Sequence, residues 1–260
     1  MTQLPPDSVV RRLRKSVRLY RARTQGYAGV ARLLLQALLG RVDEVWIGDS
    51  HAVHVNSATM VTALRRLPDG RWIWHLGPRI MYSIAREGLP PAVLRVLAMI
   101  GRTRRASEIV WVFSFGEIDV RCHLVPRMGD LDKALAFVPL YIDQLHRAAT
   151  VAGARRTLVL VPPPQSDTYP EQAGFPVVGS LAERVKATLE LRDAMIRAVD
   201  ALPPGGASVI LIDVTDELSD ERGAILEELT YDGLHTNEAG RGVIRAEVEQ
   251  LLRQTADGRA

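Results

Sequence analysis

The stretch that decides the fold is Val45-Trp46-Ile47-Gly48-Asp49-Ser50-His51, an apolar run that ends in a small polar corner. An apolar run bounded by a glycine predicts a buried strand. Gly48 lets the backbone turn sharply, and the apolar residues from Ala52 to Leu64 predict a helix after it. Ser50 is therefore expected where a strand ends and a helix begins, beside backbone N–H groups that lack helical partners. Such groups stabilise a developing oxyanion, which makes Ser50 a candidate nucleophile.

A second motif, Asp232-Gly233-Leu234-His235, stands near the C-terminus. A histidine three residues after an aspartate can have its ring oriented by that carboxylate. The pair then supplies the base that a serine needs in order to attack a carbonyl carbon. Ser50, Asp232 and His235 are therefore the predicted catalytic residues.

The two motifs, in this order, resemble those of the SGNH (GDSL-like) hydrolase superfamily. In that superfamily a Gly-Asp-Ser block follows the first strand and an Asp-x-x-His block precedes the last helix, and the resemblance covers roughly residues 43 to 252. It implies an oxyanion hole that uses the N–H of Ser50 and the N–H of a glycine after the second strand, which Gly77 matches. A turn glycine without that role remains the alternative for Gly77.

The rest of the chain alternates between strand and helix patterns. Strands are expected within residues 45–48, 71–77, 108–115, 157–161 and 208–214, and helices within 93–100, 131–149, 185–199 and 238–252. The alternation predicts an α/β fold in three layers, with a five-stranded parallel sheet between helices, as in SGNH-hydrolase-like and flavodoxin-like proteins. Ligands bind such sheets beyond the carboxyl ends of the strands. The long connection over residues 162–179 falls at that edge and is expected to act as a lid or substrate wall.

The charge of the chain is unevenly distributed. Residues 8–42 contain nine Arg or Lys and no acidic residue, whereas residues 43–260 contain 24 basic and 29 acidic residues. Residues 1–42 are therefore predicted to form a basic helical arm packed on a single catalytic domain of residues 43–260. The arm is either a solvated helix or a contact for an anionic ligand, an acidic partner or a membrane surface. No nucleic-acid-binding motif is present, and nucleic acid is not an expected partner.

The remaining composition argues for a cytoplasmic enzyme. No apolar run is long enough to span a membrane, and the first residues lack a signal-peptide pattern. Cys122 is the single cysteine, so a reducing compartment is expected, and it is interpreted as a small buried residue. His51 and His54 are spaced for one helix face, but no third ligand has recognisable spacing, so no metal site is predicted.

The third block departs from the superfamily pattern. Where the resemblance implies Gly-x-Asn-Asp, the chain reads Gly116-Glu117-Ile118-Asp119, and the side chain of Ile118 cannot donate a hydrogen bond. Loss of one such donor costs about a hundredfold in rate. If the chain stays extended, alternation places four polar side chains on one side of the strand: Glu117, Asp119, Arg121 and His123. They then either form a local ion pair or line a pocket for sugar hydroxyls. The predicted substrate-binding residues are this set, Glu117, Asp119, Arg121 and His123, together with the two neighbours of Ser50, Asp49 and His51.

The form Gly-Glu-Ile-Asp-x-Arg-x-His resembles a subgroup of SGNH-like proteins associated with glycan and polysaccharide biosynthesis. In size and motifs the chain is also similar to SGNH-type octanoyltransferases of actinobacterial methylglucose lipopolysaccharide synthesis. The resemblance implies an acyltransferase with no bound cofactor, which moves an acyl group from a small-molecule donor, acyl-CoA, to a sugar hydroxyl. A carbohydrate esterase or deacetylase with the same triad is the alternative, and a carbohydrate-binding protein with impaired catalysis is the third interpretation. The oligomeric state is left open.

Overall fold

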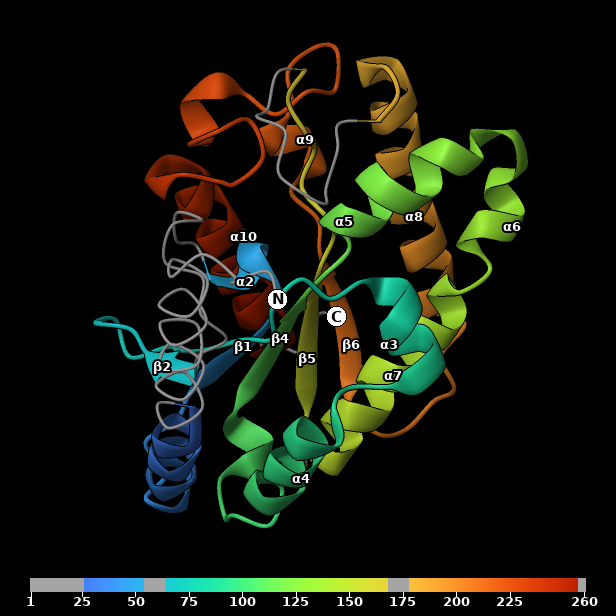
Figure 1. The fold of residues 1–260 in the computed structure, drawn as a ribbon. Helices are drawn as coiled ribbons and strands as arrows, with labels where there is room; N and C mark the ends of the chain where they lie inside the picture. The colour runs from blue at the N-terminus through green and yellow to red at the C-terminus, as the bar shows by residue number, and fades with distance from the viewer. Residues whose placement is uncertain (1–25, 54–63, 168–177, 257–260) are drawn as a thin grey trace, which may run out of the picture.

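The computed structural model describes residues 26–53, 64–167 and 178–256. Within these ranges a six-stranded sheet has the order β2-β3-β1-β4-β5-β6 (Figure 1). The strands are β1 Glu44–Gly48, β2 Leu64–Arg66, β3 Trp72–His75, β4 Val110–Ser114, β5 Arg156–Leu160 and β6 Ser208–Ile212. Every pairing is parallel except that of β2 with β3. The predicted α/β fold is confirmed, and its strand number is corrected from five to six.

The additional strand, β2, lies where the sequence predicts the end of a helix. The helix expected from Ala52 to Leu64 is described only at its start, as α2 (Ser50–Val53), and residue 64 already belongs to β2. A turn joins β2 to β3, in which Leu67 N donates to Arg71 O and Gly70 N to Leu67 O. A three-residue edge strand is too short to give a periodic signal, which is why the pattern missed it.

Two apolar layers cover the sheet, because alternate residues of each strand face opposite sides. Val45 and Ile47 pack in one cluster with helices α3 (Met81–Glu87), α4 (Pro91–Ile100), α7 (Val138–Val151) and α8 (Leu181–Asp200). Trp46 packs in the other cluster with α9 (Thr215–Leu218) and α10 (Glu238–Ala256). The apolar run of β1 is continuous because the strand is buried on both faces.

The helices expected within residues 93–100, 185–199 and 238–252 are confirmed as α4, α8 and α10, whereas α3 was not predicted. The single helix expected over residues 131–149 is two helices, α6 (Leu131–Leu135) and α7, and Pro139 stands in the first turn of α7. Proline lacks an N–H and is tolerated in the first turn of a helix. The apolar periodicity of the sequence therefore continues across the boundary between α6 and α7, which is why the pattern predicted a single helix. Asn237 caps the start of α10, because its Oδ1 accepts hydrogen bonds from Ala239 N and Gly240 N.

Short turns complete the carboxyl edge of the sheet, where α5 and α9 lie beyond the strand ends (Figure 1). These turns include α5 (Glu117–Asp119), the π-helical turn η3 (Val120–Leu124), and the 3₁₀ helices η4 (Val125–Asp130) and η5 (Glu227–Leu229), whereas the 3₁₀ helix η2 (Ala106–Glu108) lies at the opposite edge, before β4. π-Helical turns are rare and often occur at functional sites. This one follows the third sequence block directly.

The N-terminal region is described only from residue 26. Residues 26–38 form a helix, and Leu33 and Ala37 are buried in the core of the body. The most basic part of the predicted arm, residues 8–25, lies outside the described residues, and the domain boundary at residue 42 stays a prediction. Among the described residues, no helix is long and apolar enough to cross a membrane.

Replacement of Gly48 by alanine is expected to destabilise the fold by about 3 kcal/mol or more. A Cβ atom at this position would lie 2.1 Å from Ser114 O and 2.7 Å from Ala52 Cβ. Neither the strand backbone nor the helix start can move away without loss of register. The matched control is Gly242→Ala in α10, where a Cβ meets nothing within 4 Å and the helix should gain stability. Urea unfolding of both variants checks this, and an unchanged midpoint for Gly48→Ala would contradict it.

Candidate active site

Three sequence blocks meet at one row of the sheet. Gly48 of β1 lies opposite His75 of β3 on one side and opposite Ser114 of β4 on the other. Two residues beyond this row lie Ser50 and Gly77, and Gly116 at the start of the third block. Because parallel strands end at a common edge, the register alone brings the three blocks together there.

The Asp232-x-x-His235 motif adds two side chains to Ser50 and completes a hydrogen-bonded chain of three. Ser50 Oγ lies 3.0 Å from His235 Nε2, and His235 Nδ1 lies 2.8 Å from Asp232 Oδ2. Ser50 is half-buried and His235 is only 7% exposed. This is the geometry of a serine nucleophile, its base and the carboxylate that orients the base.

The loop that carries Asp232 and His235 is fixed at both ends. Thr230 and Thr236 form an isolated antiparallel bridge, and Thr230 Oγ1 donates to His235 O at 2.9 Å. Gly233, with φ of 78°, makes the tight turn, and its carbonyl accepts a hydrogen bond from Ser166 N at 2.8 Å. The loop is therefore held by its own bridge and by the connection after β5.

Hydrogen bonds keep Asp232 ionised. Burial alone would raise its pKa, but hydrogen bonds from the His235 ring and from the N–H groups of His235 and Leu234 lower the pKa to about 2. The carboxylate therefore remains charged across the physiological range. It holds the proton of His235 on Nδ1 and leaves Nε2 free to accept the proton of Ser50.

Gly77 occupies the position expected for an oxyanion donor. Its φ of 79° lies in the left-handed region that favours glycine. Leu76 N donates to Gly48 O, which ties this loop to the strand that carries Ser50. The role of the two N–H groups, of Ser50 and Gly77, in holding an oxyanion stays a prediction.

The third block is helical, and its predicted extended alternation is wrong. Gly116, with φ of 121°, starts the turn into α5, and a Cβ there would lie 2.5 Å from Met81 Sδ and 2.6 Å from Pro162 Cγ. A β-strand pattern cannot continue through such a residue. Ile118 is 7% exposed and belongs to neither core cluster.

Helical spacing pairs Glu117 with Arg121, the local ion pair that was one of the two interpretations. Arg121 Nε lies 2.9 Å from Glu117 Oε1, and both side chains are at most 3% exposed. Burial raises the pKa of Glu117, and the charges of Arg121 and His235 oppose that rise. A buried ion pair therefore stands within electrostatic reach of the triad histidine.

Gln165 is a site residue that the sequence did not indicate. It follows three prolines after β5, is buried, and donates from Nε2 to Glu117 Oε1 at 3.2 Å. Its neighbour Ser166 contacts the triad loop through Gly233. The available signal was its position as the first polar residue after the carboxyl end of β5. Tyr169 and Phe175 of the predicted lid lie outside the described residues.

Asp119 is fully buried and holds the start of α3. Its two carboxylate oxygens accept hydrogen bonds from Met81 N at 2.7 Å and Tyr82 N at 3.1 Å. Direct contact with a substrate was predicted for Asp119 and Arg121. In the structure the carboxylate of Asp119 accepts from the N–H groups at the start of α3 and the guanidinium of Arg121 pairs with Glu117, and contact of either with a substrate stays a prediction.

Burial raises the pKa of Asp119 to about 7, although the N–H groups of Met81 and Tyr82 lower it. The folded protein therefore keeps a proton that the unfolded chain releases near pH 4. The free energy of unfolding should fall as the pH rises from about 4 to 7, by up to about 4 kcal/mol. In Asp119→Asn this part of the pH dependence should vanish, whereas the exposed control Asp193→Asn should keep it. Urea unfolding across this range tests the prediction, and equal slopes for wild type and Asp119→Asn would refute it.

Asp49 and His51 stand on either side of the serine. Asp49 Oδ1 accepts a hydrogen bond from His51 N at 2.9 Å, and Oδ2 is buried with no hydrogen-bond partner among the described residues. Burial, with the nearby charges of Glu117 and Asp119, places the pKa of Asp49 well above its ordinary value. The His51 ring stacks on His235 with centroids 5.1 Å apart. His51 therefore supports the base from one face, and its contact with substrate stays a prediction.

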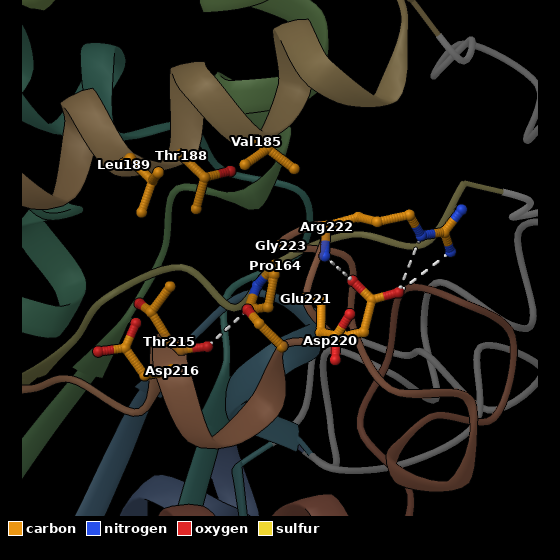
Figure 2. A pocket seen from close by; sticks show the side chains of 11 residues that line it. Pro164, Val185, Thr188, Leu189, Thr215, Asp216, Asp220, Glu221, Arg222 and Gly223 are labelled. Atoms are coloured by element: carbon orange, nitrogen blue, oxygen red, sulfur yellow. Dashed lines mark hydrogen bonds and ion pairs between the residues drawn. The ribbon is translucent and has the colours of Figure 1, made fainter.

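His123 is the predicted substrate-binding residue that lines a cavity. This cavity has a volume of about 840 Å³ and lies between the start of α3, the turns η3 and η4, and α6. A second hollow of about 370 Å³ lies between α8 and the loop after α9 (Figure 2). There Asp220 is satisfied within its own loop by Arg222 N and Ala224 N, and none of the predicted site residues lines it. Within the described part of the chain, no cluster of three or more His, Cys, Asp or Glu side chains could hold a metal ion.

Comparisons with known proteins identify the fold. No protein-family model matches the sequence, and the search of curated proteins found no match. Among solved structures, a Streptococcus pneumonia protein provisionally described as a platelet activating factor matches with a TM-score of 0.53 and 15% identity, over 94% of this chain and 99% of that one. A GDSL-like lipase from Bacteroides thetaiotaomicron matches with a TM-score of 0.49 and 13% identity, over 82% and 88%. A carbohydrate esterase family 3 protein from Talaromyces cellulolyticus has a TM-score of 0.48 and 14% identity, over 84% and 100%. At 15% identity, the similarity to the Streptococcus pneumonia protein shows that the two chains share a fold.

Proposed function

We propose that the protein is a serine-dependent acyltransferase of the SGNH type, which moves an acyl group from acyl-CoA to a sugar hydroxyl. The observation that carries this proposal is the chain of contacts from Ser50 Oγ through His235 to Asp232, at 3.0 and 2.8 Å. The Gly-Asp-Ser and Asp-x-x-His motifs that supply these residues support the superfamily. The glycan-associated form of the third block supports a sugar acceptor, and the likeness to octanoyltransferases supports a medium chain such as octanoyl.

The proposed reaction has two halves that use the same residues. His235 Nε2 takes the proton of Ser50 Oγ, the oxygen attacks the thioester carbon, and the thiol leaves with the proton that His235 returns. The N–H groups of Ser50 and Gly77 hold the oxyanion of each tetrahedral intermediate. His235 then deprotonates the sugar hydroxyl, which attacks the acyl-serine. A sugar ester forms, and Ser50 recovers its proton.

An esterase or deacetylase is the second candidate. It is favoured by the partial exposure of Ser50, because water reaching the acyl-serine would hydrolyse it. The same triad serves both reactions, and only the competition between water and a sugar hydroxyl for the acyl-enzyme separates them.

A product assay by mass spectrometry tests the proposal. Purified protein is incubated with acyl-CoA donors of graded chain length, with and without glucosyl acceptors. Acylated sugar that requires both Ser50 and the acceptor is the expected result. Free fatty acid released at the same rate with and without acceptor would show that the protein is an esterase and not a transferase. If Ser50→Ala retains the biological role, the protein acts by binding carbohydrate.

A further inference from the structure

The cavity of about 840 Å³ has a composition suited to an amphipathic anion. Its wall is apolar and its rim carries charge, as the lining residues show: Ile80, Tyr82, Leu124, Phe137, Arg127 and Lys133. The volume lies within the range of about 300–1,000 Å³ that is usual for small-molecule sites. An apolar wall with a cationic rim would accept an apolar chain that ends in an anionic group.

The cavity borders two of the sequence blocks at the edge of the sheet. Ile80 follows the Gly77 loop by three residues and is the N-cap of α3. The first turn of α3 is tied to the third block, because Tyr82 N donates to Asp119 Oδ1. His123, on the π-helical turn after that block, lines the same cavity. A ligand in this cavity would therefore lie against the elements that position the oxyanion loop.

Two features of the rim indicate that a ligand is expected there. Tyr82 is 49% exposed although it is a large aromatic residue, and its ring packs edge-on against Phe137 with centroids 5.8 Å apart. Lys133 is exposed and has no ion pair within the described ranges, and Arg127 contacts only the carbonyl of His123 there. Asp130 is the one acidic residue of the lining, so the rim carries a net positive charge. Exposed aromatic surface beside unpaired cations is typical of a binding site.

We propose that this cavity binds the acyl donor, with the acyl chain against Tyr82, Leu124 and Phe137 and the donor's phosphate groups at Arg127 and Lys133. The inference rests on the proposed function for the identity of the donor and adds the place where it binds. If the acyl chain lies there, the residues of α3 and α6 that line the cavity determine which acyl chain length the enzyme accepts. The sugar acceptor must then approach Ser50 from another direction.

The test separates binding from turnover. The probe is the thioether octyl-CoA, which cannot transfer its alkyl group, and its affinity is measured by calorimetry. Ala134→Trp fills the cavity and should weaken binding by about tenfold or more. Ala136→Trp, an exposed alanine on the same segment that does not line the cavity, is the matched control and should bind like the wild type. Lys133→Ala should weaken binding about fivefold in a salt-dependent manner, and the control Lys186→Ala should not.

A kinetic measurement completes the test. The ratio of kcat/KM for octanoyl to that for acetyl thioesters should fall in Ala134→Trp and stay constant in Ala136→Trp. Wild-type affinity and chain-length preference in Ala134→Trp would overturn the cavity assignment while leaving Ser50 chemistry intact. Weakened octyl-CoA binding in a protein that shows no Ser50-dependent transfer would support the cavity and reject the proposed function.

Discussion

Replacement of Ser50 by alanine is expected to reduce acyl transfer by about 10⁴-fold or more. The variant lacks the oxygen that receives the acyl group, and no other hydroxyl stands against His235 Nε2 among the described contacts. The rate of acylated product or released thiol measures the loss. Removal of Ser50 leaves the oxyanion donors in place, so a small residual rate above that in water is also expected.

The loss in Ser50→Ala must arise from chemistry and not from unfolding. Among the described residues the Ser50 hydroxyl makes one hydrogen bond, to His235, so its removal should change the free energy of unfolding by about 1 kcal/mol. Ser208→Ala, an exposed serine at the start of β6, is the matched control and should retain full activity. Ser50→Ala with activity within tenfold of the wild type would show that the nucleophile is another group.

Replacement of Asp232 by asparagine is expected to lower the rate by about 10³- to 10⁴-fold. An amide N–H facing Nδ1 would reverse the tautomer of His235, so that Nε2 carries a proton and cannot accept the one on Ser50. The asparagine Oδ1 can still accept the N–H groups of Leu234 and His235, so the loop should keep its shape. Steady-state kinetics with a thioester donor measures the effect.

The control for this variant is Asp193→Asn, which neutralises an exposed carboxylate on α8 and should leave the rate unchanged. Thermal unfolding of Asp232→Asn should remain close to that of the wild type. A rate in Asp232→Asn equal to the wild-type rate would show that His235 does not depend on this carboxylate for its orientation.

The sequence predicted the central strands and the chain of three side chains because both depend on local patterns. The apolar run of β1 is continuous, and the Asp232 loop contains base and orienting carboxylate within four residues, so neither required knowledge of distant contacts. That the Asp232 loop meets Ser50 was implied by the resemblance to the SGNH superfamily, because β6 ends at Ile212 and two short helices separate it from Asp232. The contacts among Ser50, His235 and Asp232 could therefore be predicted, and their catalytic roles stay a prediction.

The features that the sequence analysis missed depend on tertiary contacts, and the periodicity of a sequence carries no information about those contacts. Edge strand β2 is three residues long and exists because β3 offers it an open edge. The third block turns helical at Gly116, since Met81 and Pro162 leave no room for a side chain there. Gln165 joins the site through Glu117, 48 residues earlier in the chain. Each depends on a tertiary neighbour, so local propensity alone could not place it.

The measurement that tests the central claim most directly is a search for the acyl-enzyme itself. The protein is mixed with octanoyl-CoA in the absence of acceptor, quenched in acid within seconds, and analysed by intact mass and peptide mapping. The expected result is one octanoyl group esterified to the peptide that contains Ser50, absent in Ser50→Ala and lost on addition of a sugar acceptor. Octanoyl on another residue such as the half-buried Cys122, with Ser50 unmodified during turnover, would contradict the account.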